Sequence, residues 1–325
     1  MNDSFKKIAK TIKKSNSIAL FTHISPDMDA LGSSMSLYYA IKSLGKKVSI
    51  FVKDNITETQ ATLVDTNVFE KDCNQSEYDL FISTDTPSQK RLGDYAKIFI
   101  AGQRKIVLDH HLNDDLKGDL NFVDTSYSSC SEISYQVIKE LKVKITPQIA
   151  SYVFMGLSSD TNAFTNSNTN ASSFKTAYEL TIANADITNI NELLYKTHTT
   201  KEIDLKKFLY NNYHLENGIC FCLVTCNDLK KLNATKADCD FFSSELINMQ
   251  GANFAFSIIE STPSFYEISL RSKHGYNVRD VAEKFGGGGH ICAAGAKLKY
   301  ESIEKLKDTL VDTIKYSGEW WLQMV

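Results

Sequence analysis

The sequence lacks any apolar run close to the ~18 consecutive residues typical of a transmembrane helix. Its first residues also lack the apolar core of a secretory signal, so we expect a cytoplasmic protein without a membrane partner. Neither sign of charge dominates, because 36 Lys and Arg face 39 Asp and Glu, which gives a net charge of −3. A long duplex partner usually requires a basic face, so we expect small anionic substrates instead.

A disulfide framework is absent as well. The seven cysteines are odd in number and scattered, so we expect reduced thiols. Cys220, Cys222 and Cys226 form the closest group, but the fourth ligand and the spacing of a zinc knuckle are missing. Cys220 and Cys222 alternate within an apolar run, which favours two positions on the same face of a buried strand.

What the sequence does contain is the composition of an ordinary globular protein, with 42% hydrophobic and 23% charged residues over 325 positions. This length predicts about two domains. In the first part strands alternate with helical stretches, which indicates a mostly parallel sheet. The expected strands are 17–22, 47–52, 79–84, 104–109 and 121–124, and the expected helices are 3–14, 30–44, 129–141, 146–158 and 172–183.

A polar, helical segment at about 186–216 is expected to be a linker between a domain at 1–185 and a domain at 217–325. The pattern after it predicts a smaller α+β domain. Its expected strands are 219–226, 253–260, 265–271 and 294–299, and its expected helices are 239–249, 277–285 and 301–316. The Trp320-Trp321 tail is expected to pack on either domain or on a partner subunit. The oligomeric state stays open, and a homodimer is one option.

Acids and one histidine follow the first strand. His23, Asp27 and Asp29 stand between an apolar run and a helical repeat, at the place where open α/β sheets bind ligands. The N-terminus of the next helix also favours anions. One imidazole and two carboxylates suit Mn²⁺ or Mg²⁺. The alternative is that Asp29 only caps the helix and that His23 is an ordinary histidine at the end of a strand.

Three further clusters change the balance between these readings. Asp85 follows the apolar run 80–84, and Asp109-His110-His111 follows the run 106–108. Asp160 comes near the end of an expected helix. Four independent helix caps made only of Asp and His would be a coincidence. The sequence therefore predicts one shared metal site.

In this order the clusters resemble those of the DHH-type phosphoesterases, and Asp109-His110-His111 is the triplet that names them. The run 286–290, Gly-Gly-Gly-Gly-His, followed by Ala-Ala-Gly at 293–295, resembles the signature of the DHH-associated domain. The resemblance covers nearly the whole chain. It implies an α/β fold in which a parallel-sheet N-terminal DHH domain is joined by a helical linker to a smaller α+β DHH-associated domain.

The resemblance also implies a cofactor of two Mn²⁺ per chain, with Mg²⁺ as the alternative. Asp85 would bridge the two metals, and a hydroxide pinned between them would attack phosphorus. His111 is implied to contact the scissile phosphate or the leaving oxygen, with Asp109 as its companion. The implied ligands are His23, Asp27 and Asp85 for one metal and Asp29, Asp85, His110 and Asp160 for the other.

The second domain is expected to bind substrate. Arg271 can hold a phosphate bidentately. Consecutive glycines lose much conformational entropy on folding, and they suit a place where backbone approaches a ligand and presents N–H groups. A flexible linker is the alternative, but the flanking Phe285 and His290 argue against it. The expected substrate residues are Arg271, Ser272, Gly287, Gly288, Gly289 and His290.

Because the motifs occur without an inserted or appended domain, the chain resembles the small stand-alone members of the family. We expect hydrolysis of short oligoribonucleotides or dinucleotides to mononucleotides. The alternative substrates are 3′-phosphoadenosine 5′-phosphate (PAP) and cyclic dinucleotides, and the non-enzyme alternative is a nucleotide-sensing binding protein. Intact ligand clusters argue against the last. Met28 and Asn162 stand where glycine is common in the family, which bears on substrate preference.

Overall fold

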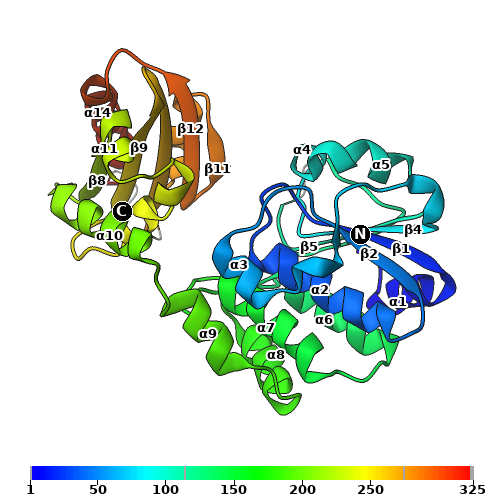
Figure 1. Ribbon diagram of the computed structural model, residues 1–325. Helices are drawn as coiled ribbons and strands as arrows, with labels where there is room; N and C mark the ends of the chain where they lie inside the picture. Colours follow the sequence, from blue (N-terminus) through cyan, green and yellow to red (C-terminus); the bar gives the residue numbers. More distant parts are fainter. Residues whose placement is uncertain (1, 113–114, 274, 323–325) are drawn as a thin grey trace. The chain divides into compact units, whose positions relative to one another are not determined.

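The structure is a computed structural model that describes residues 2–112, 115–273 and 275–322, with side chains up to residue 316. The chain divides into two compact units, residues 1–197 and 198–325 (Figure 1). The segment expected to be a linker, 186–216, is shared between them: α9 (Ile187–Tyr195) lies in the first unit, and α10 (Thr200–Asn212) and β7 (Tyr213–Glu216) lie in the second. The side chains of the Trp320-Trp321 tail lie outside the described residues.

The first unit contains a six-stranded sheet in which all neighbouring strands are parallel, as expected. The strand order is β3-β2-β1-β4-β5-β6, so the order reverses between β1 and β4. In open α/β sheets, ligands bind at the carboxyl ends of the strands at such a point. The strands are β1 (Ser17–Phe21), β2 (Lys47–Phe51), β3 (Phe69–Glu70), β4 (Leu80–Thr84), β5 (Lys105–Asp109) and β6 (Leu120–Val123).

Helices cover both faces of this sheet (Figure 1). Along β1, Ile18 and Leu20 join the core under one layer of helices, whereas Ala19 and Phe21 join the core under α4 and α5. This alternation follows from the two-residue period of a strand. The helices of this unit, besides α9, are α1 (Phe5–Lys14), α2 (Met28–Lys42), α3 (Glu58–Leu63), α4 (Gln89–Leu92), α5 (Ala96–Ala101), α6 (Cys130–Leu141), α7 (Pro147–Asp160) and α8 (Ala171–Ile182).

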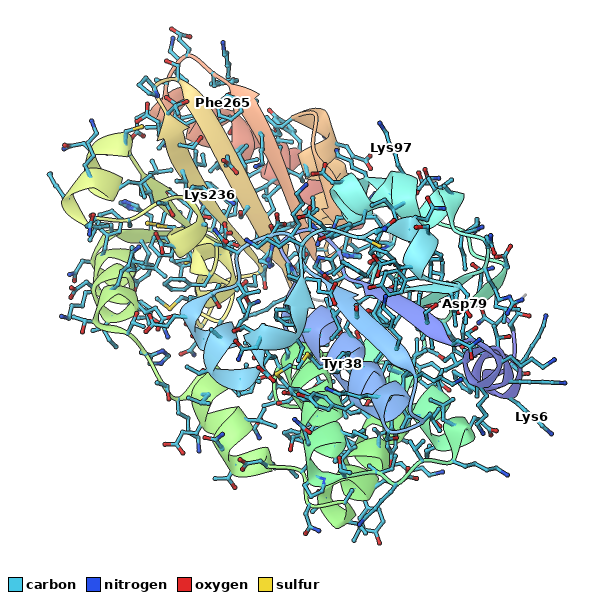
Figure 2. All side chains as sticks on the ribbon, turned by 45° about the vertical axis from the view of Figure 1, so that its right-hand side comes forward. Lys6, Tyr38, Asp79, Lys97, Lys236 and Phe265 are labelled. Atoms are coloured by element: carbon cyan, nitrogen blue, oxygen red, sulfur yellow. The ribbon has the colours of Figure 1, made fainter. Side chains whose placement is uncertain are left out.

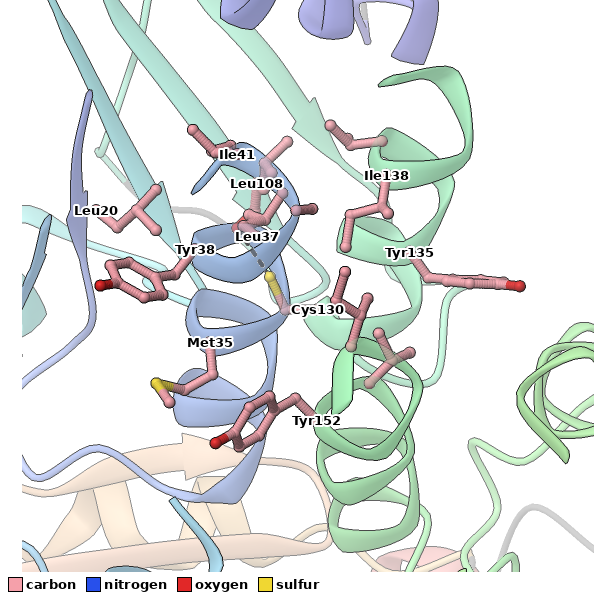
Figure 3. Close-up of a cluster of buried hydrophobic side chains, with 14 of the residues drawn as sticks. Leu20, Met35, Leu37, Tyr38, Ile41, Leu108, Cys130, Tyr135, Ile138 and Tyr152 are labelled. Atoms are coloured by element: carbon pink, nitrogen blue, oxygen red, sulfur yellow. Dashed lines mark hydrogen bonds between the residues drawn. The ribbon is translucent and has the colours of Figure 1, made fainter. Parts of the chain in front are cut away.

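The larger core lies where α2 meets α6 and α7 (Figure 3). Met35 and Leu37 of α2 are fully buried there, together with Ile138 of α6. Cys130 Sγ, at the start of α6, donates a hydrogen bond to the carbonyl of Leu108 at 3.2 Å, and so ties α6 to the end of β5. Lysines such as Lys6 on α1 project outward instead (Figure 2).

The second unit contains a mixed six-stranded sheet in the order β11-β12-β10-β9-β8-β7, in which only β8 and β9 pair in parallel. It is the smaller α+β part that the pattern predicts. Besides β7 and α10, its elements are β8 (Ile219–Val224), α11 (Cys226–Lys231), α12 (Phe242–Leu246), β9 (Phe254–Thr262), β10 (Phe265–Ser272), α13 (Val278–Lys284), β11 (Gly288–His290), β12 (Ala293–Lys299) and α14 (Ile303–Leu322).

Two expected elements of this unit are wrong in extent. The strand 219–226 ends at Val224, because Thr225 caps α11 by accepting a hydrogen bond from the amide of Asp228. The helix 239–249 is a 3₁₀ turn at Ala237–Cys239 followed by the short α12. Cys220 and Cys222 lie fully buried on one face of β8, as expected. Across 2–112, 115–273 and 275–322, no helix has both the length and the apolarity to span a membrane.

Candidate metal centre

Four of the predicted ligands lie at the carboxyl ends of elements in the first unit, and the other two, Asp27 and Asp29, lie at the N-terminus of α2. His23 follows β1, Asp85 follows β4, Asp109 ends β5 and precedes His110, and Asp160 ends α7. Because β1, β4 and β5 are neighbours in the sheet, their ends bring these side chains together. Three groups of donor atoms result, and within each group the atoms lie within 4.8 Å of one another.

The first group is His23, Asp27 and Asp85. His23 Nε2 lies 3.7 Å from Asp27 Oδ2 and 3.6 Å from Asp85 Oδ2. The other ring nitrogen, Nδ1, lies 2.8 Å from the carbonyl oxygen of Ile24. A second contact was not expected from the sequence: Arg91 Nη2 lies 2.7 Å from the same Nδ1. No motif marks Arg91, which lies in the short helix α4.

The second group is Asp29, His110 and Asp160. His110 Nε2 lies 3.0 Å from Asp160 Oδ2 and 3.9 Å from Asp29 Oδ2. The same nitrogen lies 3.5 Å from Asp85 Oδ1. Asp85 therefore turns one oxygen toward His23 and the other toward His110, which is the geometry of a bridging carboxylate. These groups reproduce the ligand sets that the resemblance implies, although their role as ligands stays a prediction.

Buried polar atoms show that this cluster fits a cation. Both carboxylate oxygens of Asp85 are buried without a hydrogen-bond partner among the described residues. Such atoms cost free energy unless a ligand satisfies them. Carboxylate oxygens with imidazole nitrogens suit Mn²⁺ or Mg²⁺, whereas the thiolates that softer metals prefer are missing from all three groups.

The pKa shifts in this cluster also indicate that it favours a cation. Burial raises the pKa of Asp160 to about 6, and it raises the pKa of Asp29 well above its usual range, with the charges of Asp160 and Asp85 adding to the effect. Burial alone lowers the pKa of His23, but Asp27 and Asp85 outweigh burial and raise it to about 9. The clustered carboxylates thus favour added positive charge. Protons or imidazolium cations can supply this charge, and a metal cation would supply it instead.

Asp29 is held by a helix that the sequence did not connect with it. Its Oδ2 accepts a hydrogen bond from the amide of Cys130 at 2.6 Å, and its Oδ1 accepts one from the amide of Ser131 at 2.9 Å. These amides open α6, whose N-terminus favours a negative charge. The cap of α2 is Asp27, which accepts hydrogen bonds from the amides of Asp29 and Ala30, both at 3.0 Å. Asp29 is therefore not the cap of α2, and its carboxylate instead accepts hydrogen bonds from the amides that open α6.

Asp109 and His111 are paired beside the metal ligands. Asp109 is fully buried, and its Oδ1 lies 3.0 Å from His111 Nδ1. The same oxygen accepts hydrogen bonds from the amides of His110 and His111 at 2.8 and 3.1 Å. His111 Nδ1 also lies 3.3 Å from Asp85 Oδ1, and His111 forms the third group of donor atoms with Asp85 and His110. His111, together with Lys117 and Asn121, lines a cavity of about 620 Å³.

The substrate residues expected in the second unit meet on one sheet. Arg271 of β10 pairs with Ala293 of β12, and Ala293 pairs with His290 of β11. Directly paired residues point to the same face, so Arg271 and His290 flank the small side chain of Ala293. Burial lowers the pKa of Arg271, and its Nη1 donates to the carbonyl of Leu270 at 2.9 Å. Ser272 is less available, because its hydroxyl donates to the carbonyl of Tyr276 at 2.8 Å.

Packing accounts for part of the glycine run. Gly286 has φ 74° at the end of α13, where the amides of Gly286 and Gly287 donate to carbonyls of that helix. A Cβ on Gly287 would lie 2.0 Å from the carbonyl oxygen of Gly295, and one on Gly289 would lie 2.6 Å from that of Ala293. Close packing against β12 therefore explains Gly287 and Gly289 without a ligand. Gly288 is different, since its Cβ would meet nothing within 4 Å.

One of the two departures from the family pattern, Asn162, has a local explanation. Asn162 has φ 46° in a turn of three consecutive left-handed residues directly after Asp160 and Thr161. Asparagine tolerates this conformation better than most other residues, so it can replace glycine there. Its neighbours Asn166 and Asn168 donate side-chain hydrogen bonds to the carbonyl of Asp160 at 2.9 and 3.2 Å. Met28 is a buried residue in the first turn of α2.

Comparison with known proteins identifies the family. The model of the DHH family, N-terminal domain, matches residues 17–157, and that of the DHHA1 domain matches residues 218–316. The bifunctional oligoribonuclease and PAP phosphatase NrnA of Mycoplasma pneumoniae is 30% identical over 303 residues, which are 91% of this chain and 92% of the relative.

Solved structures share the fold. An exopolyphosphatase-related protein of Bacteroides fragilis matches with a TM-score of 0.88 at 23% identity, over 98% of this chain and 96% of the other. RecJ of Thermus thermophilus in complex with Mn²⁺ matches with a TM-score of 0.59 at 13% identity, over 97% of this chain and 55% of that protein. With its two matched domains and its full-length relative, the chain belongs to the DHH family.

Proposed function

We propose that this protein is a metal-dependent phosphodiesterase that hydrolyses short oligoribonucleotides or dinucleotides to mononucleotides. The observation that carries the proposal is the buried cluster around Asp85, whose oxygens have no hydrogen-bond partner among the described residues and face three imidazoles. The relative from M. pneumoniae is an oligoribonuclease of nearly the same length, which supports the same substrate class.

Mn²⁺ is the proposed cofactor, with two ions per chain and Mg²⁺ as the alternative. The residues that would hold them are the six predicted ligands, and bound divalent cations would polarise a phosphate and lower the pKa of water so that a nucleophile exists at neutral pH. Asp85 would be the ligand that both ions share. Asp29 would bind as an anion already held in place by the amides of Cys130 and Ser131.

The remaining chemistry would fall to His111 and to the second unit. Asp109 fixes the His111 ring through Nδ1, so the imidazole can present a hydrogen-bond donor to a phosphate oxygen or to the leaving oxygen. Arg271 and His290 share a sheet face on which an anion can bind. Arginine suits this role because its planar fork matches two phosphate oxygens.

PAP phosphatase activity is the second candidate, and the bifunctional relative favours it. Both reactions break a bond between phosphorus and an oxygen, so one metal centre can serve both. A binding protein without activity is disfavoured, because the described ligand groups include every predicted metal ligand.

The decisive experiment removes the bridging carboxylate with Asp85→Asn. We expect loss of turnover on 5′-phosphorylated diadenylate and on PAP, together with a fall in bound Mn²⁺ from about two ions to fewer than one per chain, because both ions share this ligand. The exposed Asp72→Asn is a matched control that should keep both. Plasma mass spectrometry measures the metal beside the kinetics. Two ions and wild-type turnover in Asp85→Asn would refute the shared centre.

A further inference from the structure

Arg91 is fixed beside the metal centre by its backbone. The amide of Ile24 donates to the carbonyl of Arg91 at 2.7 Å. Gly93 lies so close that a Cβ there would be 2.5 Å from Ile24 Cγ2. Both contacts join α4 to the loop that carries His23 and Asp27. These contacts fix the backbone of Arg91 close to His23. Its guanidinium then lies within 2.7 Å of His23 Nδ1.

The guanidinium has no anionic partner among the described residues. It is half-buried, and no ion pair in the described parts of the chain includes it, whereas the nearby Lys53 pairs with Asp94. It is not needed to orient His23 either, because the Nδ1 that it approaches already has the carbonyl of Ile24 at 2.8 Å. A partly desolvated, permanently charged group without a counter-ion favours an anionic ligand.

The place of this charge relative to the metal groups limits which anion it can bind. Asp27 and Asp85 lie against Nε2 of His23, whereas Arg91 approaches Nδ1. Arg91 therefore lies across the imidazole ring from the atoms that would hold the metal. A phosphate bound to the metals would face Nε2. The group within reach of Arg91 is then a second phosphate on the same substrate.

We propose that Arg91 binds the non-scissile 5′-phosphate of the nucleotide whose 3′-linked phosphorus is hydrolysed, an inference that rests on the proposed function. The two proposed substrates share this fragment. In a 5′-phosphorylated dinucleotide the scissile phosphorus is attached to the 3′ oxygen of the first nucleoside, and in PAP the 3′-phosphate is removed. Each carries a 5′-phosphate on that same nucleoside. One arginine would thus serve both activities.

The test compares two substrates that differ only in the 5′-phosphate, the dinucleotides pApA and ApA, with the full-length Mn²⁺-loaded protein. Arg91→Gln should lower kcat/KM for pApA by about 10- to 100-fold, mainly through KM, as expected for a lost hydrogen-bonded charge. Turnover of ApA should change by less than about threefold. Arg91→Lys should retain part of the preference, because it keeps the charge without the fork.

Lys90→Gln is the matched control, since it removes one positive charge from an exposed side chain on the same helix turn and should alter neither substrate. Metal content should be equal in all variants. An equal loss on both substrates, a loss of metal in Arg91→Gln, or an unchanged pApA rate would each overturn the proposal. If wild-type protein hydrolyses neither dinucleotide, the proposed function fails; calorimetric binding of pApA and ApA to Ca²⁺-loaded protein then decides the role of Arg91 independently.

Discussion

Gly288 combines two properties that none of its three glycine neighbours has together. It has open space around its Cα, and it lacks the positive φ of Gly286 and Gly289, which are at 74° and 144°. A methyl group at Gly288 would therefore meet solvent and cause no backbone strain. A methyl group at position 287 would instead collide with the backbone of β12. Alanine substitutions at the two positions therefore distinguish a ligand-binding role of the glycine run from a packing role.

We predict that Gly288→Ala keeps its melting temperature but raises KM for short RNA by about tenfold, because the methyl group would occupy space that the substrate needs. Gly287→Ala should instead lose about 1–3 kcal/mol of stability from overpacking. Thermal unfolding and steady-state kinetics on both variants give the comparison. Wild-type KM in Gly288→Ala would show that the open space at this glycine is not used by substrate.

At the scale of elements, the metal centre depends on where three helices meet. A Cβ on Gly156 of α7 would lie 1.9 Å from Ser131 Oγ and 2.5 Å from Asp29 Oδ1. A Cβ on Gly32 of α2 would lie 2.6 Å from the carbonyl oxygen of Tyr152. The close approach of α2, α6 and α7 is thus what allows the amides of α6 to reach the Asp29 carboxylate.

Gly156→Ala should therefore lower metal affinity by about 10- to 100-fold, the range typical for residues that support a ligand without touching the metal. Adding Ser131→Gly removes the nearest atom, so the double variant should recover part of the affinity. Calorimetric Mn²⁺ titration measures both, and circular dichroism checks that the variants fold. Unchanged affinity in Gly156→Ala would mean that the helix contact does not position Asp29.

Local patterns predict the elements that carry the ligands, because a buried strand and the polar residues after it are adjacent in sequence. The ends of β1, β4 and β5 are in this class. The strands β3 and β11 have only two and three residues, which is too short for a periodic signal. The hydrogen bonds from α6 to Asp29 join residues about a hundred positions apart, and the contact of Arg91 with His23 spans 68. Such contacts depend on the folded topology, so no local pattern contains them.

For the whole molecule, each unit has its own core on both faces of its sheet, and the surface charges are largely balanced. The cores of the first unit surround β1, and those of the second surround β8 and β9. Lysines in both units are paired with carboxylates, as in Lys47–Glu77 and Lys236–Asp240. With a net charge of −3, the chain offers an RNA backbone little general attraction.

This charge balance predicts how turnover depends on substrate length. A protein that holds long single strands needs a positively charged groove along their backbone, and its binding then weakens steeply with salt. Here the cations proposed to meet substrate are few, chiefly Arg91 and Arg271, so only one or two phosphates beyond the scissile one gain from them. We therefore expect mononucleotide products from RNAs of about two to five nucleotides, with efficiency falling as length grows and with a shallow dependence on salt. Gel analysis of end-labelled RNAs of increasing length, at two salt concentrations, measures both. Equal rates on a long RNA, or fragments cut from its interior, would show that contacts along the whole strand contribute to binding.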